Sequence, residues 1–357
     1  MIGNEEHLAR DKAPPVLLKR DGGTLSVVLH RPEALNSLNH TMVLLIQDAL
    51  IGAGQDPSIR VVLFYGKGTG GFCAGGDIKA MARSVREGRL EEALAFLEAE
   101  YALDLFIHRF PKPVVVLADG ITMGGGLGIS AGADVVLATE RTRTAMPETR
   151  IGFFPDVGAT GWMFEKCPPG YPEYLGLTGH EMIGPECVRV GLATRLVASE
   201  HLPDIVRRLE QDSAGLSRGR IVAANEILCL LDPFFAKGAR PKPDMDRWVK
   251  EYFEGKTSIP AMIADLRQCS LFSKLCEDVF SHLSERSPTA LAVTLQLLRR
   301  NEGRPLPEVF EADLKAARFI LSHPDFLEGV RARLVDKDDR PQWQPARIEE
   351  VGRVDFL

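Results

Sequence analysis

Short apolar runs alternate with glycine-rich turns and helix-period segments along the first part of the chain. Val16–Leu18 and Leu25–Leu29 are apolar runs on either side of Asp21-Gly22-Gly23, a pattern that predicts a β-hairpin. From His40 to Ala53 the apolar residues recur at helical spacing, and Asn39 is suited to be the N-cap of this helix.

The same alternation continues through two long glycine-rich stretches. Apolar runs at 61–65, 114–117 and 135–138 predict buried strands, and the residues at 77–89 and 91–109 predict helices. The glycine-rich stretches, Gly66–Gly76 and Gly120–Gly132, each follow one of these strands. Strand, glycine-rich turn and helix in repetition predict an α/β layered fold whose turns carry ligands.

The pattern changes beyond about Pro203, where strand signals disappear and helical periodicity dominates. We therefore predict an α/β core at 14–205 and a helical C-terminal region at 206–357 that packs on this core. The segment Pro233–Pro243 is the most linker-like part. Helices are predicted at 203–216, 220–231, 245–253, 259–271, 287–300 and 307–322.

Composition and charge argue against several classes of function. Of the 357 residues, 45% are hydrophobic and 26% charged, and the net charge of -6 comes without a basic stripe, which argues against nucleic-acid binding. The six cysteines include no CxxC and no zinc-type spacing, so we predict no metal and a reducing, cytoplasmic compartment. The polar start resembles no signal peptide, and no apolar run approaches the roughly 20 residues of a membrane span.

Two motifs point to functions that their context does not favour. Gly66–Gly71 matches the dinucleotide-binding pattern GxGxxG, but Phe72-Cys73-Ala74 follows where a helix should begin. Gly128–Gly132 matches the GxSxG pattern around Ser130, with His180 and His201 as potential partners. About ten glycine-rich residues separate this serine from the nearest strand, whereas a nucleophile elbow follows its strand directly.

The two glycine-rich turns together indicate a function that neither turn indicates alone. Glycine lets backbone N–H groups approach a ligand closely, and two such groups converging on a carbonyl oxygen form an oxyanion hole. The turns Phe72–Ile78 and Asp119–Gly126, about 50 residues apart, resemble those of the crotonase superfamily. The resemblance implies a crotonase-like ββα spiral core and assigns the oxyanion donors to Gly76 and Gly125.

The resemblance also implies where coenzyme A binds. Arg31-Pro32-Glu33-Ala34-Leu35-Asn36 is similar to the family's early segment that contacts coenzyme A. By this similarity the expected contacts come from Ala34 and Leu35, together with Asp77, Ile78 and Lys79 at the end of the first turn.

The carboxylates indicate which member of the superfamily the chain resembles. Enoyl-CoA hydratases use two glutamates; the second matches Glu148 in Pro147-Glu148-Thr149, but the first falls at Gly128. This departure, with the run Phe154-Pro155-Asp156-Val157-Gly158, resembles the 3-hydroxyisobutyryl-CoA hydrolase subgroup. By that resemblance Glu148 is catalytic, Asp156 assists it, and Glu100 contacts the substrate.

The resemblance extends over residues 14–357 and implies thioester hydrolysis in valine catabolism. It implies no cofactor, because coenzyme A is part of the acyl-CoA substrate, and it allows a homo-oligomer because crotonase cores often form trimers. Two alternatives stay open: an enoyl-CoA hydratase or isomerase on the same fold, and a non-catalytic acyl-CoA-binding protein. Glu148 could act as a general base or as a nucleophile.

Overall fold

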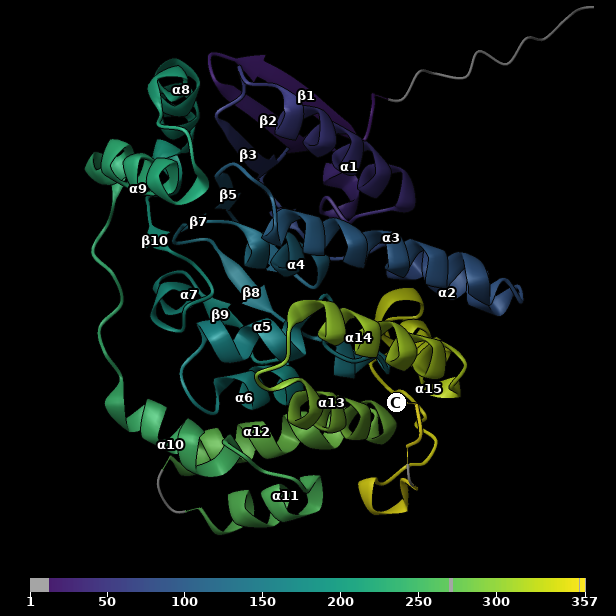
Figure 1. Ribbon diagram of the computed structural model, residues 1–357. Helices are drawn as coiled ribbons and strands as arrows, with labels where there is room; N and C mark the ends of the chain where they lie inside the picture. The colour runs from purple at the N-terminus through teal and green to yellow at the C-terminus, as the bar shows by residue number, and fades with distance from the viewer. Residues whose placement is uncertain (1–12, 270–271, 353, 357) are drawn as a thin grey trace, which may run out of the picture.

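The computed structural model describes residues 13–269, 272–352 and 354–356, and its first part is built on a six-stranded sheet (Figure 1). In this sheet β1 pairs antiparallel with β2, and the remaining neighbours are parallel. The strand order is β1 (Val16–Asp21), β2 (Thr24–Leu29), β3 (Val61–Gly66), β5 (Val114–Ala118), β7 (Val135–Ala138) and β10 (Arg195–Leu196).

A second, smaller sheet follows from the same stretches of chain. Its order is β4 (Gly71–Cys73), β6 (Ile121–Met123), β8 (Arg143–Ala145) and β9 (Met182–Ile183). Each of β3, β5 and β7 in the large sheet is followed by one short strand of the small sheet, and each pair then leads into helical structure. This repetition confirms the predicted ββα spiral core.

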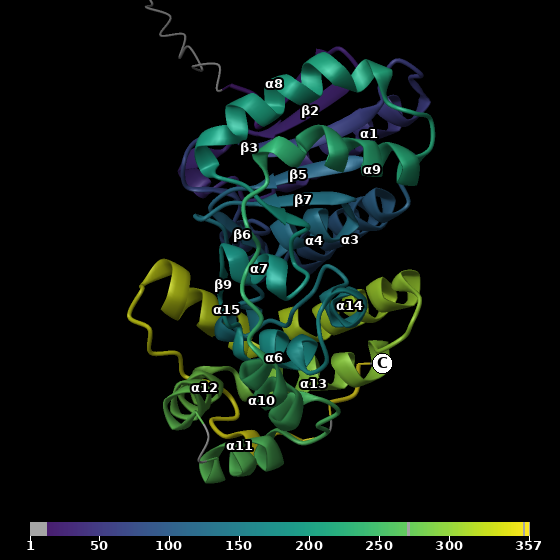
Figure 2. The same ribbon diagram turned by 90° about the vertical axis from the view of Figure 1, so that its left-hand side faces the viewer.

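The two faces of the large sheet are covered by different helices, as the alternation of side chains along its strands requires. Val62, Phe64, Val114 and Val116 belong to the cluster with α1 (His40–Gln55), α3 (Leu90–His108) and α4 (Gly125–Gly132). Residues of the opposite parity, such as Leu63 and Val115, pack against α8 (Leu202–Asp212) and α9 (Arg220–Leu231). Figure 2 shows α8 and α9 lying across this second face.

The helices that follow α9 form, with α5 (Ala159–Lys166) and α6 (Tyr171–Thr178), a separate layer below the sheets (Figures 1 and 2). Helix α14 (Leu306–Leu321) packs on α3, and α15 (Pro324–Val330) packs on α2 (Ile78–Arg86). The other helices of this layer are α10 (Pro243–Phe253), α11 (Ile259–Gln268), α12 (Ser273–Glu285) and α13 (Pro288–Asn301). The short helix α7 (Pro185–Arg189) packs instead against β7, β9 and β10.

Most predicted elements are present, and the exceptions have a physical reason. The hairpin turns at Gly22, whose φ is +54°, and Asn39 caps α1 by accepting from Met42 N at 2.9 Å. The second sheet, β10 and helices α5, α6, α7, α12 and α15 are not among the predictions, and of these only α12 spans more than eight residues. Strands of two or three residues are too short for a periodic signal, and α15 spans only two turns. The end of the predicted helix 259–271 lies outside the described residues.

Candidate active site

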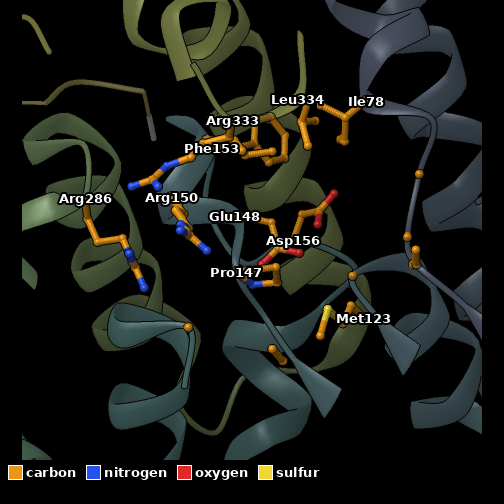
Figure 3. Close-up of a pocket in the computed structure, with 18 of the residues that line it drawn as sticks. Ile78, Met123, Pro147, Glu148, Arg150, Phe153, Asp156, Arg286, Arg333 and Leu334 are labelled. Atoms are coloured by element: carbon orange, nitrogen blue, oxygen red, sulfur yellow. The ribbon is translucent and has the colours of Figure 1, made fainter. Parts of the chain in front are cut away.

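The two glycine-rich turns meet at a cavity of about 580 Å³ between the sheets and the C-terminal helices (Figure 3). Parallel pairing of β4 with β6 and of β6 with β8 places the turns that follow these strands side by side. Six of the residues predicted from sequence to form the site contribute backbone or side-chain atoms to its wall: Gly76, Ile78, Glu100, Gly125, Glu148 and Asp156.

Gly76 and Gly125 lie on neighbouring parts of this wall. Gly75 and Gly124, which precede them, have φ of +102° and +48°, conformations that a side chain disfavours and that turn the following N–H groups. Gly125 begins α4, where the first N–H groups of a helix have no intrahelical acceptor. Within the described residues, neither N–H donates to a backbone carbonyl, so both stay available to a ligand.

Glu100 reaches both of these glycines from α3. A Cβ built on Gly125 would overlap Glu100 Oε1, and one built on Gly76 would lie 3.6 Å from Glu100 Oε2. The side chain is only 2% exposed, and burial raises the pKa of its carboxyl well above the usual range, with the nearby charge of Asp156 adding to the effect. A protonated Glu100 beside the two N–H groups would leave their field free to attract a developing oxyanion.

Glu148 begins the short 3₁₀ helix that follows β8 and directs its carboxyl toward the second turn. Its Oε1 lies 3.1 Å from the position of a Cβ on Gly124, and its buried Oε2 has no hydrogen-bond partner within the described residues. Burial raises the pKa of Glu148 well above its ordinary value, and the charges of Asp156 and Glu100 add to this. An unpartnered buried carboxyl in a cavity is suited to bind or activate water.

Asp156 lies beside Glu148 in the middle of the cavity (Figure 3). Its Oδ2 accepts a hydrogen bond of 2.9 Å from the hydroxyl of Tyr101, one residue after Glu100 on α3. Burial raises the pKa of Asp156 to about 7, although the Tyr101 hydroxyl opposes the shift. Both carboxyls thus have a raised pKa, and that of Asp156 lies in the range where a proton can be exchanged at low cost.

Two further buried carboxyls, Asp104 and Asp313, lie behind these residues and are not among the sequence predictions. Neither oxygen of Asp104 has a hydrogen-bond partner within the described residues, and burial raises its pKa well above the usual range. Asp313 accepts from Gly158 N at 2.8 Å, which ties α14 to the loop that carries Asp156. One signal for Asp104 was available, because it lies four residues after Glu100 and shares its helix face.

Asp104 explains the departure at Gly128. A Cβ on Gly128 would lie 2.5 Å from Asp104 Oδ2 and 2.9 Å from Val157 Cβ. Contacts below 3.0 Å leave no room for a side chain without displacing one of these neighbours. The space next to Gly128 is therefore already filled, and no glutamate side chain can extend from this position into the cavity.

The substitution Gly128→Glu is expected to destabilise the fold without creating hydratase activity. Overpacking costs about 1–3 kcal/mol, and a second carboxyl beside Asp104 adds an unpaired buried charge. Urea unfolding would show the loss, and Gly52→Glu is the control because nothing lies within 4 Å of a Cβ on exposed Gly52. A stable Gly128→Glu variant that hydrates enoyl-CoA would contradict the interpretation.

The predicted coenzyme A contacts fall in two groups. Ile78 lines the cavity, whereas Asp77 caps α2 and binds Arg31 at 2.9 Å, and Lys79 is exposed on the outer side of α2. Ala34 and Leu35 lie outside the cavity wall but adjoin the first turn, because Leu35 O accepts from Ala74 N at 3.1 Å. The structure thus brings the two predicted segments together at one rim of the site.

The two competing motifs have structural roles. Ser130 Oγ donates to Gly126 O of its own helix at 2.8 Å, and its side chain faces away from the cavity that His180 lines. Gly66 ends β3, and the next element is strand β4, so no helix begins inside the GxGxxG segment. Neither a serine nucleophile nor a dinucleotide site is formed.

The described part of the chain contains neither a cluster of metal-ligating side chains nor a membrane-spanning helix. No group of three or more histidine, cysteine or acidic side chains there is arranged to hold a metal ion. Within the same residues, each helix is too short or too polar to span a bilayer.

Comparison with known proteins places the chain in a family. The sequence model of the family described as enoyl-CoA hydratase/isomerase matches residues 24–356. The mitochondrial 3-hydroxyisobutyryl-CoA hydrolase of Gallus gallus is 35% identical over 96% of this chain and 87% of its own length. The enzyme of the same name from Xenopus tropicalis is 37% identical over 94% of this chain and 86% of its own length.

A solved structure agrees with this placement. The crystal structure of a carnitinyl-CoA dehydratase from Mycobacterium thermoresistibile is similar, with a TM-score of 0.85 and 33% identity over 95% of this chain and 94% of that one. Sequence and fold therefore agree over nearly the whole chain, which belongs to the enoyl-CoA hydratase/isomerase family and, within it, to the 3-hydroxyisobutyryl-CoA hydrolase subgroup.

Proposed function

We propose that this protein hydrolyses the thioester bond of 3-hydroxyisobutyryl-CoA, releasing 3-hydroxyisobutyrate and coenzyme A, as a step of valine catabolism. The observation that carries the proposal is the buried Glu148 carboxyl, whose Oε2 has no hydrogen-bond partner within the described residues, beside two free N–H groups. At position 128, where a hydratase would need a second glutamate, there is a glycine without room for a side chain. The relatives named as this hydrolase support the same activity.

The thioester carbonyl oxygen would bind between the N–H groups of Gly76 and Gly125. Their dipoles, with the N-terminus of α4, stabilise the negative charge that develops on this oxygen as the carbonyl becomes tetrahedral. Glu148 removes a proton from the attacking water, or attacks the carbonyl itself to form a mixed anhydride, which water then hydrolyses to release the acid and restore Glu148. Asp156, oriented by Tyr101, holds the water or the substrate hydroxyl, and collapse of the intermediate expels the thiolate of coenzyme A.

Coenzyme A would run from the thioester along Ile78, with Asp77, Lys79, Ala34 and Leu35 at the outer rim. The reaction as proposed needs no resident cofactor, since each step is a proton transfer or an acyl transfer. A reducing compartment agrees with six cysteines, all in described residues, that form no disulfide. The relatives named above are mitochondrial enzymes, so the cytoplasmic location stays a prediction, as does a homo-oligomer.

The experiment compares hydrolysis with hydration. The purified protein is given 3-hydroxyisobutyryl-CoA while free thiol is followed, and separately a 2-enoyl-CoA while the enoyl absorbance is followed. Thiol release at a rate far above enoyl loss supports the hydrolase. Enoyl loss without thiol release would establish the hydratase alternative, and binding of both ligands without turnover would establish the binding protein.

The pH dependence should link activity to stability. Folded Asp156, with a pKa of about 7, keeps a proton that its unfolded form loses near pH 4. Between these values the unfolded state binds fewer protons, so the free energy of unfolding falls by about 1.4 kcal/mol per pH unit for each such group as pH rises. The rate of thiol release should rise in the same range.

Urea unfolding and steady-state rates from about pH 4.5 to 8 check this expectation. Asp156→Asn should flatten the slope of stability against pH by one proton's share, since asparagine does not titrate. A stability that increases with pH across this range would contradict the burial of protonated carboxyls in the site.

A further inference from the structure

Three arginines line the same cavity on the side away from the proposed coenzyme A path. Arg150 follows Glu148, Arg286 precedes α13, and Arg333 lies in the π-helix Arg331–Val335 after α15. In Figure 3 the three lie on one side of Glu148 and Asp156, with Arg150 and Arg286 on the side opposite Ile78. They come from parts of the chain up to nearly 200 residues apart. The fold, and not proximity in the sequence, therefore brings these charges together.

Arg286 is the least compensated of the three. It is 5% exposed, one of its terminal nitrogens donates to Thr178 O at 2.6 Å, and its Nε has no hydrogen-bond partner within the described residues. It forms no ion pair with a carboxylate of the described chain. Burial lowers the pKa of its guanidinium to about 10, and the charges of Arg150 and Arg333 add to this.

The neighbouring carboxylates are too few to balance this wall. Asp339 binds Arg333 at 2.6 Å and lies 4.0 Å from Arg150, so one carboxylate serves two arginines. Glu285 lies 3.5 Å from Arg333. Glu181 also lines the cavity, but both of its oxygens accept from Arg143 at 2.7 and 2.8 Å.

The histidines in this wall do not change the balance. His180 and His282 both line the cavity, and burial lowers the pKa of each imidazole. The charge of His282 lowers the pKa of His180 further. They are therefore neutral at physiological pH and add neither sign of charge. A buried guanidinium without a counter-ion is costly to hold, and it is retained where a ligand supplies the missing charge.

We propose that Arg150, Arg286 and Arg333 form a subsite for an anionic group carried by the acyl-CoA substrate. Guanidinium groups bind carboxylate and phosphate oxygens through paired N–H donors, so either anion fits this chemistry. The proposal rests on the proposed thioester hydrolysis and extends its substrates beyond 3-hydroxyisobutyryl-CoA, whose acyl group is uncharged, to acyl groups that carry an anion. Because the subsite lies across Glu148 from Ile78, its favoured occupant is a carboxylate at the far end of the acyl chain, as in the mono-CoA thioester of a dicarboxylic acid.

Binding measurements in a Glu148→Gln background test this without relying on turnover. Succinyl-CoA and butyryl-CoA form a matched pair of similar acyl length, differing in a terminal carboxylate, and calorimetry gives the dissociation constant of each. We expect succinyl-CoA to bind at least tenfold more tightly. Adding Arg286→Gln should abolish that preference, whereas adding Arg318→Gln, a surface arginine paired with Glu91, should preserve it.

A different result is expected if the anion in the subsite is a phosphate of coenzyme A and not a carboxylate of the acyl group. If the subsite holds phosphates of coenzyme A, Arg286→Gln weakens both CoA thioesters equally and leaves the corresponding pantetheine thioesters, which lack the nucleotide phosphates, unaffected. Either pattern supports an anion subsite. Affinities that change less than twofold for all of these ligands, in a folded Arg286→Gln protein, would overturn it.

Thermal melting and a second variant show whether an effect of Arg286→Gln on binding results from misfolding. Removing an uncompensated buried charge should leave the melting temperature of the ligand-free protein unchanged or higher, whereas a purely structural arginine would lower it. Arg150→Gln, at an exposed position, should reduce the preference for succinyl-CoA in the same direction. If the wild-type protein releases no thiol from 3-hydroxyisobutyryl-CoA, the proposed hydrolase activity is refuted. The binding results for the arginine subsite remain valid in that case.

Discussion

Glu148→Gln is expected to lower kcat for thiol release from 3-hydroxyisobutyryl-CoA by about 10³-fold or more, which is about 4 kcal/mol of transition-state stabilisation. Glutamine preserves the shape of the side chain but can neither accept the water proton nor attack the thioester. No second unpartnered carboxyl extends from position 128 to replace it, because Asp104 and Val157 occupy that space. Steady-state kinetics with a thiol-reactive dye give kcat and KM for both proteins.

The pattern of the two constants separates chemistry from binding. KM should change little, since Glu148 is proposed to act on the water rather than to hold coenzyme A. Glu91→Gln is a control for removing one negative charge from the protein surface, because Glu91 is exposed and paired with Arg318. A Glu148→Gln enzyme within tenfold of wild type would show that another group performs the chemistry.

Gly125→Ala is expected to lower kcat by about 10²- to 10³-fold, the usual effect of losing one oxyanion donor. The methyl group would overlap Glu100 Oε1 and lie 3.3 Å from Leu38 Cδ1, so the start of α4 or the Glu100 side chain must shift. Either movement displaces the Gly125 N–H from its place beside Gly76. Kinetics and equilibrium unfolding on the same preparation distinguish this displacement from a general loss of stability.

Gly76→Ala makes a graded comparison. Its methyl group would meet Phe96 Cε1 at 3.1 Å and Glu100 Oε2 at 3.6 Å, contacts that a small rotation of the ring relieves. The loss of kcat should therefore be smaller than for Gly125→Ala. Gly54→Ala, which would meet only ordinary contacts from 3.5 Å, should behave as wild type, and equal losses in all three variants would contradict the assignment.

The extent to which the fold was predictable depends on the length of its elements. Strands β1, β2, β3, β5 and β7 of the large sheet and helices such as α1 and α9 carry several residues or turns of clear periodicity, and their predicted ranges largely agree with the structure. The sixth strand, β10, has two residues and was not predicted. The strands of the small sheet have two or three residues, and their positions depend on pairing with one another. That information is tertiary, so periodicity along the chain cannot supply it.

The candidate site divides in the same way. Gly76, Gly125 and Glu148 lie in local motifs, and the fold brings them to one cavity. Asp104 and Asp313 sit in helices without a motif, and their relation to the site depends on packing between α3, α4 and α14. The arginine subsite is further from prediction, because Arg150, Arg286 and Arg333 are ordinary surface residue types until the C-terminal layer folds over the core.

The most direct test follows free-thiol release from 3-hydroxyisobutyryl-CoA with wild type, Glu148→Gln and Ser130→Ala side by side. We predict rapid release by wild type and by Ser130→Ala, whose hydroxyl only bonds Gly126 O of its own helix, and loss of release in Glu148→Gln. Release that persists in Glu148→Gln but disappears in Ser130→Ala would contradict the account and establish a serine nucleophile instead.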